Sequence, residues 1–234
     1  MLASFVFVML MRYHRASARH NEVLLRAMVE TEERERRRIA EDMHDGLGQL
    51  LAGLKMQVGA LYRYKNPGLD GEIQELKSTL DEGMAELRRI VRNLVPRRIE
   101  HDGLVAALSD MCDHLTRSQA GVNVRFLTDG ATTRLHLPLE TNVYRIAQEL
   151  VNNAVKHAHA STVQVCLRMN ESECHLTVDD NGTGFDPSSA RGGHGLQNLR
   201  NRTRLLRGHL TFTQDGSPGT HATLVFNPNQ PIDA

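Results

Sequence analysis

The segment His44-Asp45-Gly46-Leu47-Gly48-Gln49 contains side chains that could exchange a phosphoryl group. A neutral imidazole is a good nucleophile toward phosphorus when a carboxylate takes up the proton of its other ring nitrogen, and Asp45 directly follows His44. Neighbouring side chains of a helix do not naturally face each other, so a solvent-exposed charge pair is the alternative. Gln49 shares a helical ridge with Asp45, and its amide could orient a water for phosphoryl hydrolysis.

A second group of polar residues lies on a helix predicted over Pro138–Ala158. Spacings of three and four place the group on one side of that helix, and its members are Glu149, Asn153, Lys156 and His157. Such a group could form a phosphate site, because a carboxamide oxygen suits Mg²⁺ and a cation can lie beside phosphates. The alternative is the solvent-facing side of an amphipathic helix.

Two glycine-containing segments follow in the last third of the chain. The first, Asp179–Gly184, comes directly after a predicted strand, so its aspartates could accept a hydrogen bond from an exocyclic amine. Its glycines would let a ligand approach the backbone closely. The second, Arg191–Leu196, opens a predicted helix whose N–H groups suit a polyphosphate. An ordinary turn and a flexible loop are the alternatives.

The elements that position His44 are predicted to be two helices. No proline occurs from Asn21 to Tyr64, and the charged, helix-forming composition there predicts one long helix. Turn-forming residues over Lys65–Gly71 end it, and a second helix runs to Leu94. Each helix carries an apolar stripe, made of Ile39, Met43, Leu47, Leu50, Leu54 and Leu61 in the first and Ile73, Leu76, Leu80, Met84, Leu87, Val91 and Leu94 in the second.

These two helices predict an antiparallel hairpin, and a lone hairpin would leave its apolar stripes exposed. Pairing two copies into a four-helix bundle would bury the stripes, so the pattern predicts a homodimer. Packing of the hairpin onto the rest of the chain is the alternative. His44 follows the stripe residue Met43 and so lies about 100° round the helix, which predicts that His44 faces solvent.

After Pro96 the composition changes, and glycine, threonine, asparagine and alternating β-branched residues become common. This half predicts a mixed α/β unit with helices layered on one face of a sheet. Its predicted helices are Leu104–Leu115, Pro138–Ala158 and Leu196–Leu206, and its predicted strands are Val122–Leu127, Thr162–Arg168, Cys174–Val178, His209–Thr213 and Ala222–Phe226.

The charge balance and the cysteines narrow the choice of partner and of compartment. The 234 residues hold 28 Lys and Arg against 28 Asp and Glu, so no bulk charge attracts nucleic acid. The three cysteines lack metal-type pair spacing and favour a reducing compartment.

The uncharged run Leu2–Met11 makes about 15 Å of helix, too short to span a membrane alone, and basic residues follow it. We interpret it as the end of a transmembrane helix; a buried or disordered N-terminus is the alternative.

Taken together and in this order, the four motifs resemble those of sensor histidine kinases of two-component systems, of the NarX/DesK type. Glu35–Gln49 (ERRRIAEDMHDGLGQ) resembles the phosphoacceptor motif, and Tyr144–Ala158 (YRIAQELVNNAVKHA) resembles the N box. Val178–Asp186 and Gly192–Arg202 resemble the two glycine boxes, which are shared with the wider GHKL ATPases. Gly219-Thr220 resembles the last ATP-site element. The resemblance covers about residues 30 to 228.

The resemblance implies a role for each matching residue. His44 would be phosphorylated, Asp45 would be its general base, and Gln49 would position water to dephosphorylate the partner. Asn153 would bind Mg²⁺, Asp180 would bind the adenine amine of ATP, and Glu149 would act through a metal-bound water. The remaining nucleotide-binding positions would be Lys156, His157, Gly182, Gly184, Gly193, Gly195 and Thr220.

The sequence also departs from the family pattern at two places. Gly208 follows Arg207 where paired glycines are common, and Asn201 stands where an acid is common. Both positions lie on or after the helix that follows the predicted lid. The departures therefore bear on nucleotide affinity more than on the chemistry.

The expected fold class is α+β, with a dimerising helical hairpin followed by a GHKL-type α/β sandwich. The expected parts are residues 1–11 as the end of a transmembrane helix, 12–97 as the dimerisation and phosphotransfer hairpin, and 98–234 as the ATP-binding domain, with a movable joint near Leu94–Arg98. Such a chain would be the cytoplasmic domain of a protein anchored to the inner membrane through its N-terminal segment. The implied partners are a second copy and a response regulator with a helix-turn-helix output domain, with no direct nucleic-acid contact. A non-catalytic, ATP-dependent interaction module and a coiled-coil dimerisation scaffold are the alternatives.

Overall fold

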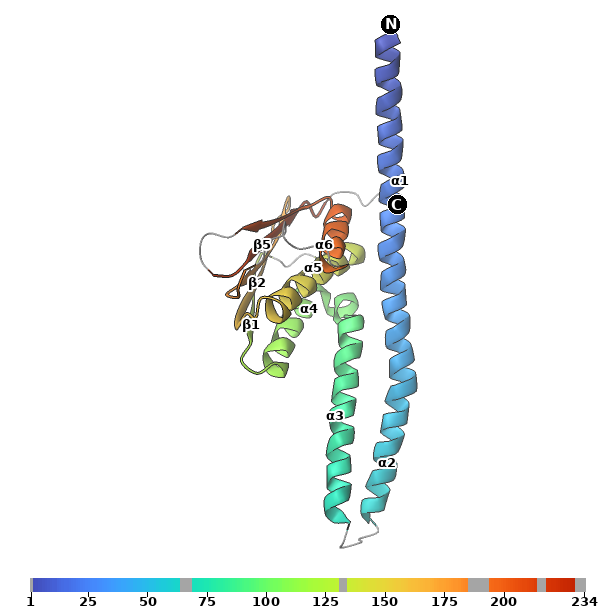
Figure 1. Ribbon diagram of the computed structural model, residues 1–234, viewed down its shortest axis with the longest axis vertical. Helices are drawn as coiled ribbons and strands as arrows, with labels where there is room; N and C mark the ends of the chain where they lie inside the picture. Colours follow the sequence, from blue (N-terminus) through green and yellow to red (C-terminus); the bar gives the residue numbers. More distant parts are fainter. Residues whose placement is uncertain (1, 64–68, 131–133, 185–193, 214–217, 230–234) are drawn as a thin grey trace. The chain divides into compact units, whose positions relative to one another are not determined.

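The computed structural model describes residues 2–63, 69–130, 134–184, 194–213 and 218–229. The chain divides into two compact units, of which one is residues 30–97 and the other holds residues 98–234 together with 1–29. The first is helical, and the second contains the only sheet of the described residues (Figure 1).

The helical unit is the predicted antiparallel hairpin. Its first arm is part of a continuous helix, made of α1 (Leu2–Asp42), a π-helical segment η1 (Met43–Gly48) and α2 (Gln49–Arg63), of which residues 30–63 belong to this unit. Its second arm is α3 (Asp70–Leu94), which packs against α2 and η1. The prediction of one long helix was therefore right in outline, although the helix starts earlier than Asn21 and its hydrogen-bonding pattern changes at Met43. Part of the predicted turn lies outside the described residues.

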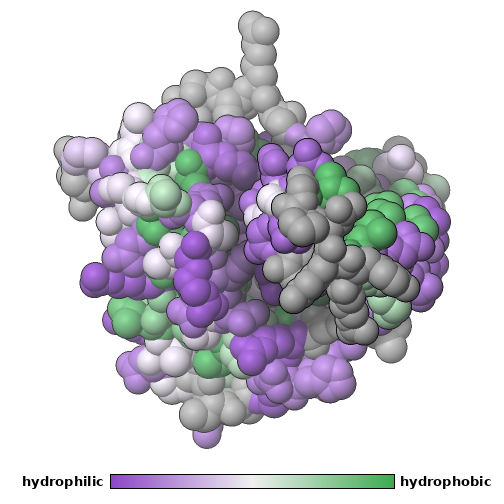
Figure 2. All heavy atoms as spheres, turned by 90° about the horizontal axis from the view of Figure 1, so that it is seen from below, coloured by the Kyte–Doolittle hydropathy of each residue, from purple (hydrophilic) through white to green (hydrophobic). Residues whose placement is uncertain are grey.

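The apolar stripe of the first arm stays largely exposed in the single chain. Leu47, Leu50, Leu54 and Leu61 are 50, 65, 48 and 59% exposed. Figure 2 looks onto the turn end of the hairpin and shows hydrophobic side chains exposed there among hydrophilic ones. Between the two arms, Lys55 Nζ donates to Asp81 Oδ1 at 2.5 Å.

The run at the start of α1 carries exposed apolar side chains, including Phe5 and Phe7. Among the described residues, no helix combines the length and the hydropathy that crossing a membrane requires.

The second unit is a five-stranded sheet with helices on one face, as predicted. The strands are β1 (Asn123–Asp129), β2 (Thr162–Met169), β3 (Cys174–Asp180), β4 (His209–Thr213) and β5 (His221–Phe226), in the order β1-β2-β3-β5-β4. Only the pairing of β1 with β2 is parallel. The helices are α4 (Arg97–Ser118), α5 (Leu137–Lys156) and α6 (His194–Leu205), which lie together on one side of the sheet (Figure 1).

Alternation of side chains along the strands explains the layering. In β2 every second residue is buried, so one face of the sheet packs against helices and the other meets solvent. The core lies between the sheet and the helices, and its fully buried members include Leu108, Val143, Ile146, Val151, Val163, Val165, Leu176 and Leu224.

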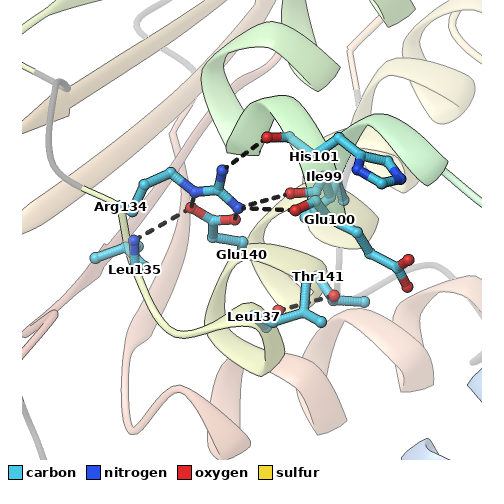
Figure 3. A network of polar contacts seen from close by, with 8 residues as sticks. All are labelled: Ile99, Glu100, His101, Arg134, Leu135, Leu137, Glu140 and Thr141. Carbon is cyan, nitrogen blue, oxygen red and sulfur yellow. Dashed lines mark hydrogen bonds and ion pairs between the residues drawn. The ribbon is translucent and has the colours of Figure 1, made fainter.

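Helix α4 begins seven residues before the predicted start at Leu104 and is kinked at Gly103, whose φ is 87°. The Arg134 guanidinium lies over the kink (Figure 3). It donates to the carbonyl oxygens of Ile99 at 2.9 Å and His101 at 3.3 Å, which lie just before Gly103. A Cβ on Gly103 would lie 2.9 Å from Arg134 Cδ, so glycine is needed both for the left-handed φ and for this close approach.

The same guanidinium pairs with a buried carboxylate at the start of α5. Glu140 accepts from Arg134 Nε at 3.1 Å, from Arg134 Nη2 at 3.2 Å and from the Leu135 N–H at 3.2 Å. The Glu140 side chain is only 2% exposed. A buried charge of this kind needs partners, and here it holds the start of α4 and the start of α5 together.

Helix α6 ends in a Schellman motif with an unfavourable residue at its left-handed position. Gly208 N–H donates to Thr203 O at 3.0 Å and Arg207 N–H donates to Arg204 O at 2.9 Å, the 6→1 and 5→2 bonds of that motif. Arg207 has a φ of 47°, where glycine is the usual residue. Gly208 itself packs closely, since a Cβ there would lie 2.8 Å from Val225 O.

We therefore expect Arg207→Gly to raise the free energy of unfolding by about 1 kcal/mol, because glycine adopts the left-handed conformation without a Cβ penalty. Denaturant unfolding followed by circular dichroism measures the change. Arg207→Ala is the control, since it removes the guanidinium but keeps the Cβ. Equal stability of the two variants would contradict the assignment of strain to Arg207.

Burial raises the pKa of two thiols and one phenol in this unit. Burial, assisted by the negative charge of Asp113, raises the pKa of Cys112 to about 12, and burial alone raises that of Cys174 to about 12. Burial likewise raises the pKa of Tyr144 to about 12, opposed by the charge of Arg145. Cys166 is only partly buried.

A raised acid pKa in the folded state means that the folded state holds its proton more tightly than the unfolded chain does. The stability from Cys112 and Cys174 is thus complete below about pH 9 and is lost as pH rises toward about 12. We expect the free energy of unfolding to fall by roughly 1.4 kcal/mol per pH unit for each thiol in that window. Urea titrations at pH 8 and 10.5 measure the fall, and a double Cys→Ala variant that falls as steeply would refute this cause.

Candidate functional site

His44 and Asp45 form a hydrogen-bonded pair on the π-helical segment of the hairpin. His44 Nδ1 lies 3.1 Å from Asp45 Oδ1, and the two side chains are 66% and 74% exposed. The solvent-facing position predicted for His44 is therefore confirmed. When Nδ1–H donates to the carboxylate, the lone pair of the neutral ring is on Nε2, which is the nitrogen left for chemistry.

The side chains of His44 and Asp45 meet within the π-helical segment. In a regular α-helix, side chains at i and i+1 diverge by about 100°. Met43–Gly48 instead has i→i+5 bonding, a local distortion that is frequent at functional sites. Gln49 begins α2 directly after this segment and is exposed. The sequence carried no signal for the π turn.

A cavity of about 550 Å³ lies in the second unit, a size typical of small-molecule sites. Most of the predicted nucleotide residues line it. Its polar lining comes from Glu149, Asn153 and His157 of α5, Asp180 at the end of β3, His194 at the start of α6 and Thr220 just before β5, with the backbone of Gly184 and Gly195.

Three of the predicted positions are not placed on this cavity. Lys156 is exposed, and neither it nor Gly182 is among the described lining residues. Gly193 lies outside the described residues. Sequence reasoning missed the apolar wall of the cavity, which includes Ala154, Ala158, Val178, Leu199, Phe212 and Ala222. Alanines beside the polar α5 positions were the available signal for close approach of a ligand.

Three glycines allow close approach of residues that line the cavity. A Cβ on Gly182 would overlap the carbonyl of Ala158, and a Cβ on Gly195 would overlap the carboxylate of Glu149. Gly219 has a φ of 120°, and a Cβ there would overlap the carbonyl of Asp180. Each glycine thus has a packing reason, and of the three only Gly195 is among the described lining residues.

The backbone around Asp180 is held on two sides. Asp180 N–H donates to Thr220 O at 3.0 Å, and Asp180 Oδ1 accepts from the Gly182 N–H at 2.8 Å. These bonds leave Asp180 Oδ2 for a ligand that carries a hydrogen-bond donor.

The donor set of the cavity fits a metal ion that arrives with a polyphosphate. Within the described ranges, no group of three or more His, Cys, Asp or Glu side chains is arranged to hold a metal by itself. Magnesium usually takes only one or two protein oxygens beside phosphate and water, and Asn153 and Glu149 supply such oxygens on one side of α5.

The two departures from the family pattern are accommodated in the fold. Asn201 is buried, and its Oδ1 accepts from Gln197 Nε2 at 3.0 Å. Arg207 adopts the left-handed conformation in the place of a glycine. Neither residue is among the described lining of the cavity.

Both units of the chain match families of known proteins. Residues 35–98 match the family described as "Histidine kinase", and residues 138–230 match the family of histidine kinase-, DNA gyrase B- and HSP90-like ATPases. Sensor histidine kinase MctS of Rhizobium johnstonii is 32% identical over 99% of this chain and 52% of its own. The histidine-protein kinase/phosphatase DegS of Brevibacillus brevis is 28% identical over 87% of this chain and 54% of its own.

The chain thus spans about half the length of these curated relatives. Among solved structures, the histidine kinase domain of a blue-light activated kinase from Erythrobacter litoralis has a TM-score of 0.52 at 19% identity, covering 79% of this chain and 96% of that one. At that identity the likeness supports the fold alone.

Proposed function

The chain belongs to the sensor histidine kinases of the NarX type, and from this membership and the two sites we propose that it transfers the γ-phosphoryl group of ATP to His44 and then to an aspartate of a response regulator. The observation that carries the proposal is the His44–Asp45 pair, which leaves His44 Nε2 as the nucleophile on an exposed helix surface. A cavity with nucleotide-type donors lies in the same chain.

The transfer step follows from the geometry of the pair. The Nε2 lone pair forms a bond to the γ-phosphorus while the bond from that phosphorus to the β–γ bridging oxygen breaks, and ADP leaves with the electron pair. Positive charge that develops on the ring is neutralised as the Nδ1 proton moves toward Asp45 Oδ1, 3.1 Å away. Asp45 also fixes the tautomer before the reaction. Catalysis is otherwise positioning and charge neutralisation.

In the cavity, Asp180 would accept the hydrogen bond of the adenine amine, and the glycines would let the nucleotide lie against the backbone. Asn153 would hold Mg²⁺, and Glu149 would bind it through water. Bound Mg²⁺ would neutralise charge on the phosphates. His157 and Thr220 lie on the same cavity, whereas Lys156 would have to turn toward it to reach a phosphate.

For the partners we propose a homodimer through the hairpin, because the leucine stripe of its first arm is about half exposed in one protomer. Gln49, beside the phosphoacceptor segment, would orient water for dephosphorylating the regulator, and the relative DegS is named a kinase/phosphatase. Two further parts complete the proposal. The regulator carries a helix-turn-helix output domain, and the chain is a cytoplasmic domain anchored to the inner membrane through its N-terminal segment.

Incubation of the chain with γ-labelled ATP and Mg²⁺ tests the kinase activity. We expect an acid-labile, base-stable label in the wild type and none in His44→Gln. Label that persists in His44→Gln would contradict the acceptor assignment. Nucleotide binding without any label in either protein would instead favour the non-catalytic, ATP-dependent module.

The phosphatase activity has a separate test. We expect Gln49→Ala to dephosphorylate a phosphorylated regulator more slowly than the wild type does, with autophosphorylation retained. Equal rates of dephosphorylation would refute the role of Gln49.

A further inference from the structure

The residue between Asp180 and Gly182 makes more hydrogen bonds to a neighbouring loop than its exposed position suggests. Asn181 Oδ1 accepts from the N–H groups of Ser161 at 3.0 Å and Thr162 at 2.9 Å. Asn181 Nδ2 donates to Ser161 Oγ at 3.0 Å, and Asn181 N–H donates to Thr162 O at 3.2 Å. One residue thus makes four bonds to Ser161 and Thr162.

These bonds continue the β2–β3 ladder beyond its last backbone pair. The register pairs Val163 with Asp180, so the next residue of β3 lies opposite Thr162. There the Asn181 N–H still donates to Thr162 O, while the carboxamide oxygen accepts from the Thr162 N–H in place of a backbone carbonyl and closes the start of β2 against the end of β3. A side-chain amide can do this because it carries both an acceptor and two donors.

The loop that Asn181 holds belongs to the cavity. Ala158 lies three residues before Ser161 and lines the cavity together with Asp180. Thr183 N–H donates to Ala158 O at 2.9 Å, and Gly182 packs against the same carbonyl. The strand end that carries Asp180 and the loop that carries Ala158 are therefore joined on both sides of Gly182, by Asn181 and by Thr183.

We propose that the Asn181 carboxamide is a positioning group for Asp180 and thereby sets the preference of the site for adenine. The inference rests on the proposed role of Asp180 as acceptor of the adenine amine. Asn181 does not touch the nucleotide. It fixes the place from which the Asp180 carboxylate meets the base, so its loss should weaken recognition of the amine more than binding of the phosphates.

The chain provides a matched control at the opposite end of the same two strands. Asn170 Oδ1 accepts from Ser172 N–H at 2.9 Å, from Ser172 Oγ at 3.1 Å and from Glu173 N–H at 2.8 Å, in the turn between β2 and β3. Its side chain makes as many bonds as that of Asn181 but lies outside the described lining of the cavity. Loss of Asn170 should cost stability without changing base preference.

Calorimetric titration of the full chain with ADP and with IDP, which has an oxygen in place of the amine, tests the proposal. We expect the wild type to prefer ADP by about tenfold or more, as for a hydrogen bond to a charged group. Asn181→Ala should lower that preference at least threefold while IDP affinity changes less than twofold. Asn181→Asp, which keeps the acceptor oxygen, should restore most of the preference, and Asn170→Ala should keep all of it.

The outcomes separate this inference from the proposed function. A preference that is lost in Asp180→Asn but kept in Asn181→Ala would overturn the positioning role alone. An equal loss in Asn170→Ala and Asn181→Ala would also overturn it, since general loosening of the sheet would then be the cause. A wild type that binds ADP and IDP equally would overturn both the role of Asp180 and that of Asn181.

Discussion

Asp45→Asn is expected to slow phosphorylation of His44 by about 10²- to 10⁴-fold, the usual range for loss of a positioned proton acceptor. The carboxylate can only accept from His44 Nδ1, which lies 3.1 Å away, and so it keeps the proton off Nε2. An asparagine can instead donate to Nδ1 and favour the tautomer with its proton on Nε2, the atom that attacks in the proposed transfer. The developing charge on the ring would also lose its counterion.

The measurement is the single-turnover rate of phosphorylation at saturating ATP, with ADP affinity measured in parallel. ADP affinity should not change, because Asp45 is not among the residues of the cavity. Asp42→Asn is a matched control, since Asp42 is an exposed carboxylate one turn earlier that pairs with Arg38 at 3.1 Å. A rate in Asp45→Asn within threefold of that in Asp42→Asn would rule out Asp45 as the proton acceptor.

The hairpin and the sheet could be predicted from the sequence because their signals are local. A stripe such as Leu47, Leu50 and Leu54 defines a helix face, and alternation along Thr162–Met169 defines a strand face. Glycines and acids after a strand likewise predicted where Asp180 would lie. Such patterns depend on neighbours in the chain, which are visible without coordinates.

What could not be predicted depends on contacts between distant residues or on small backbone differences. The π turn at Met43–Gly48 has no sequence signature, so the hydrogen bond between His44 and Asp45 was only a hypothesis. Arg134 lay in a predicted loop, with nothing to pair it with Ile99, 35 residues away. The kink at Gly103 separates the first turns of α4 from the rest of the helix and lies against that guanidinium, and the sequence-based start at Leu104 missed those turns.

The Arg134 network carries the second large prediction, which concerns stability. Arg134→Met should lower the free energy of unfolding of this unit by about 3 kcal/mol, the low end for breaking a buried ion pair because the arginine itself is half exposed. Glu140 would keep only the Leu135 N–H of the three donors that now satisfy it. The carbonyls of Ile99 and His101 would lose their donor as well. Denaturant unfolding measures the loss.

Two further variants separate the buried charge from simple loss of contacts. In Arg134→Met/Glu140→Met both charges are gone, so the double variant should be less destabilised than the sum of the single variants by at least about 1 kcal/mol. Arg98→Met breaks two ion pairs, with Asp110 at 3.2 Å and with Asp102 at 3.4 Å, in which all partners are about half exposed, and should cost about 1 kcal/mol or less. Two results would show that burial of Glu140 is not what makes this network strong. One is that the losses in free energy of unfolding of the two single variants add up to that of the double variant. The other is an equal loss in Arg134→Met and Arg98→Met. A coupling of the expected size would instead mean that the Arg134–Glu140 pair adds to the core packing that holds the start of α4, directly after the hairpin, to the helix bearing Glu149 and Asn153.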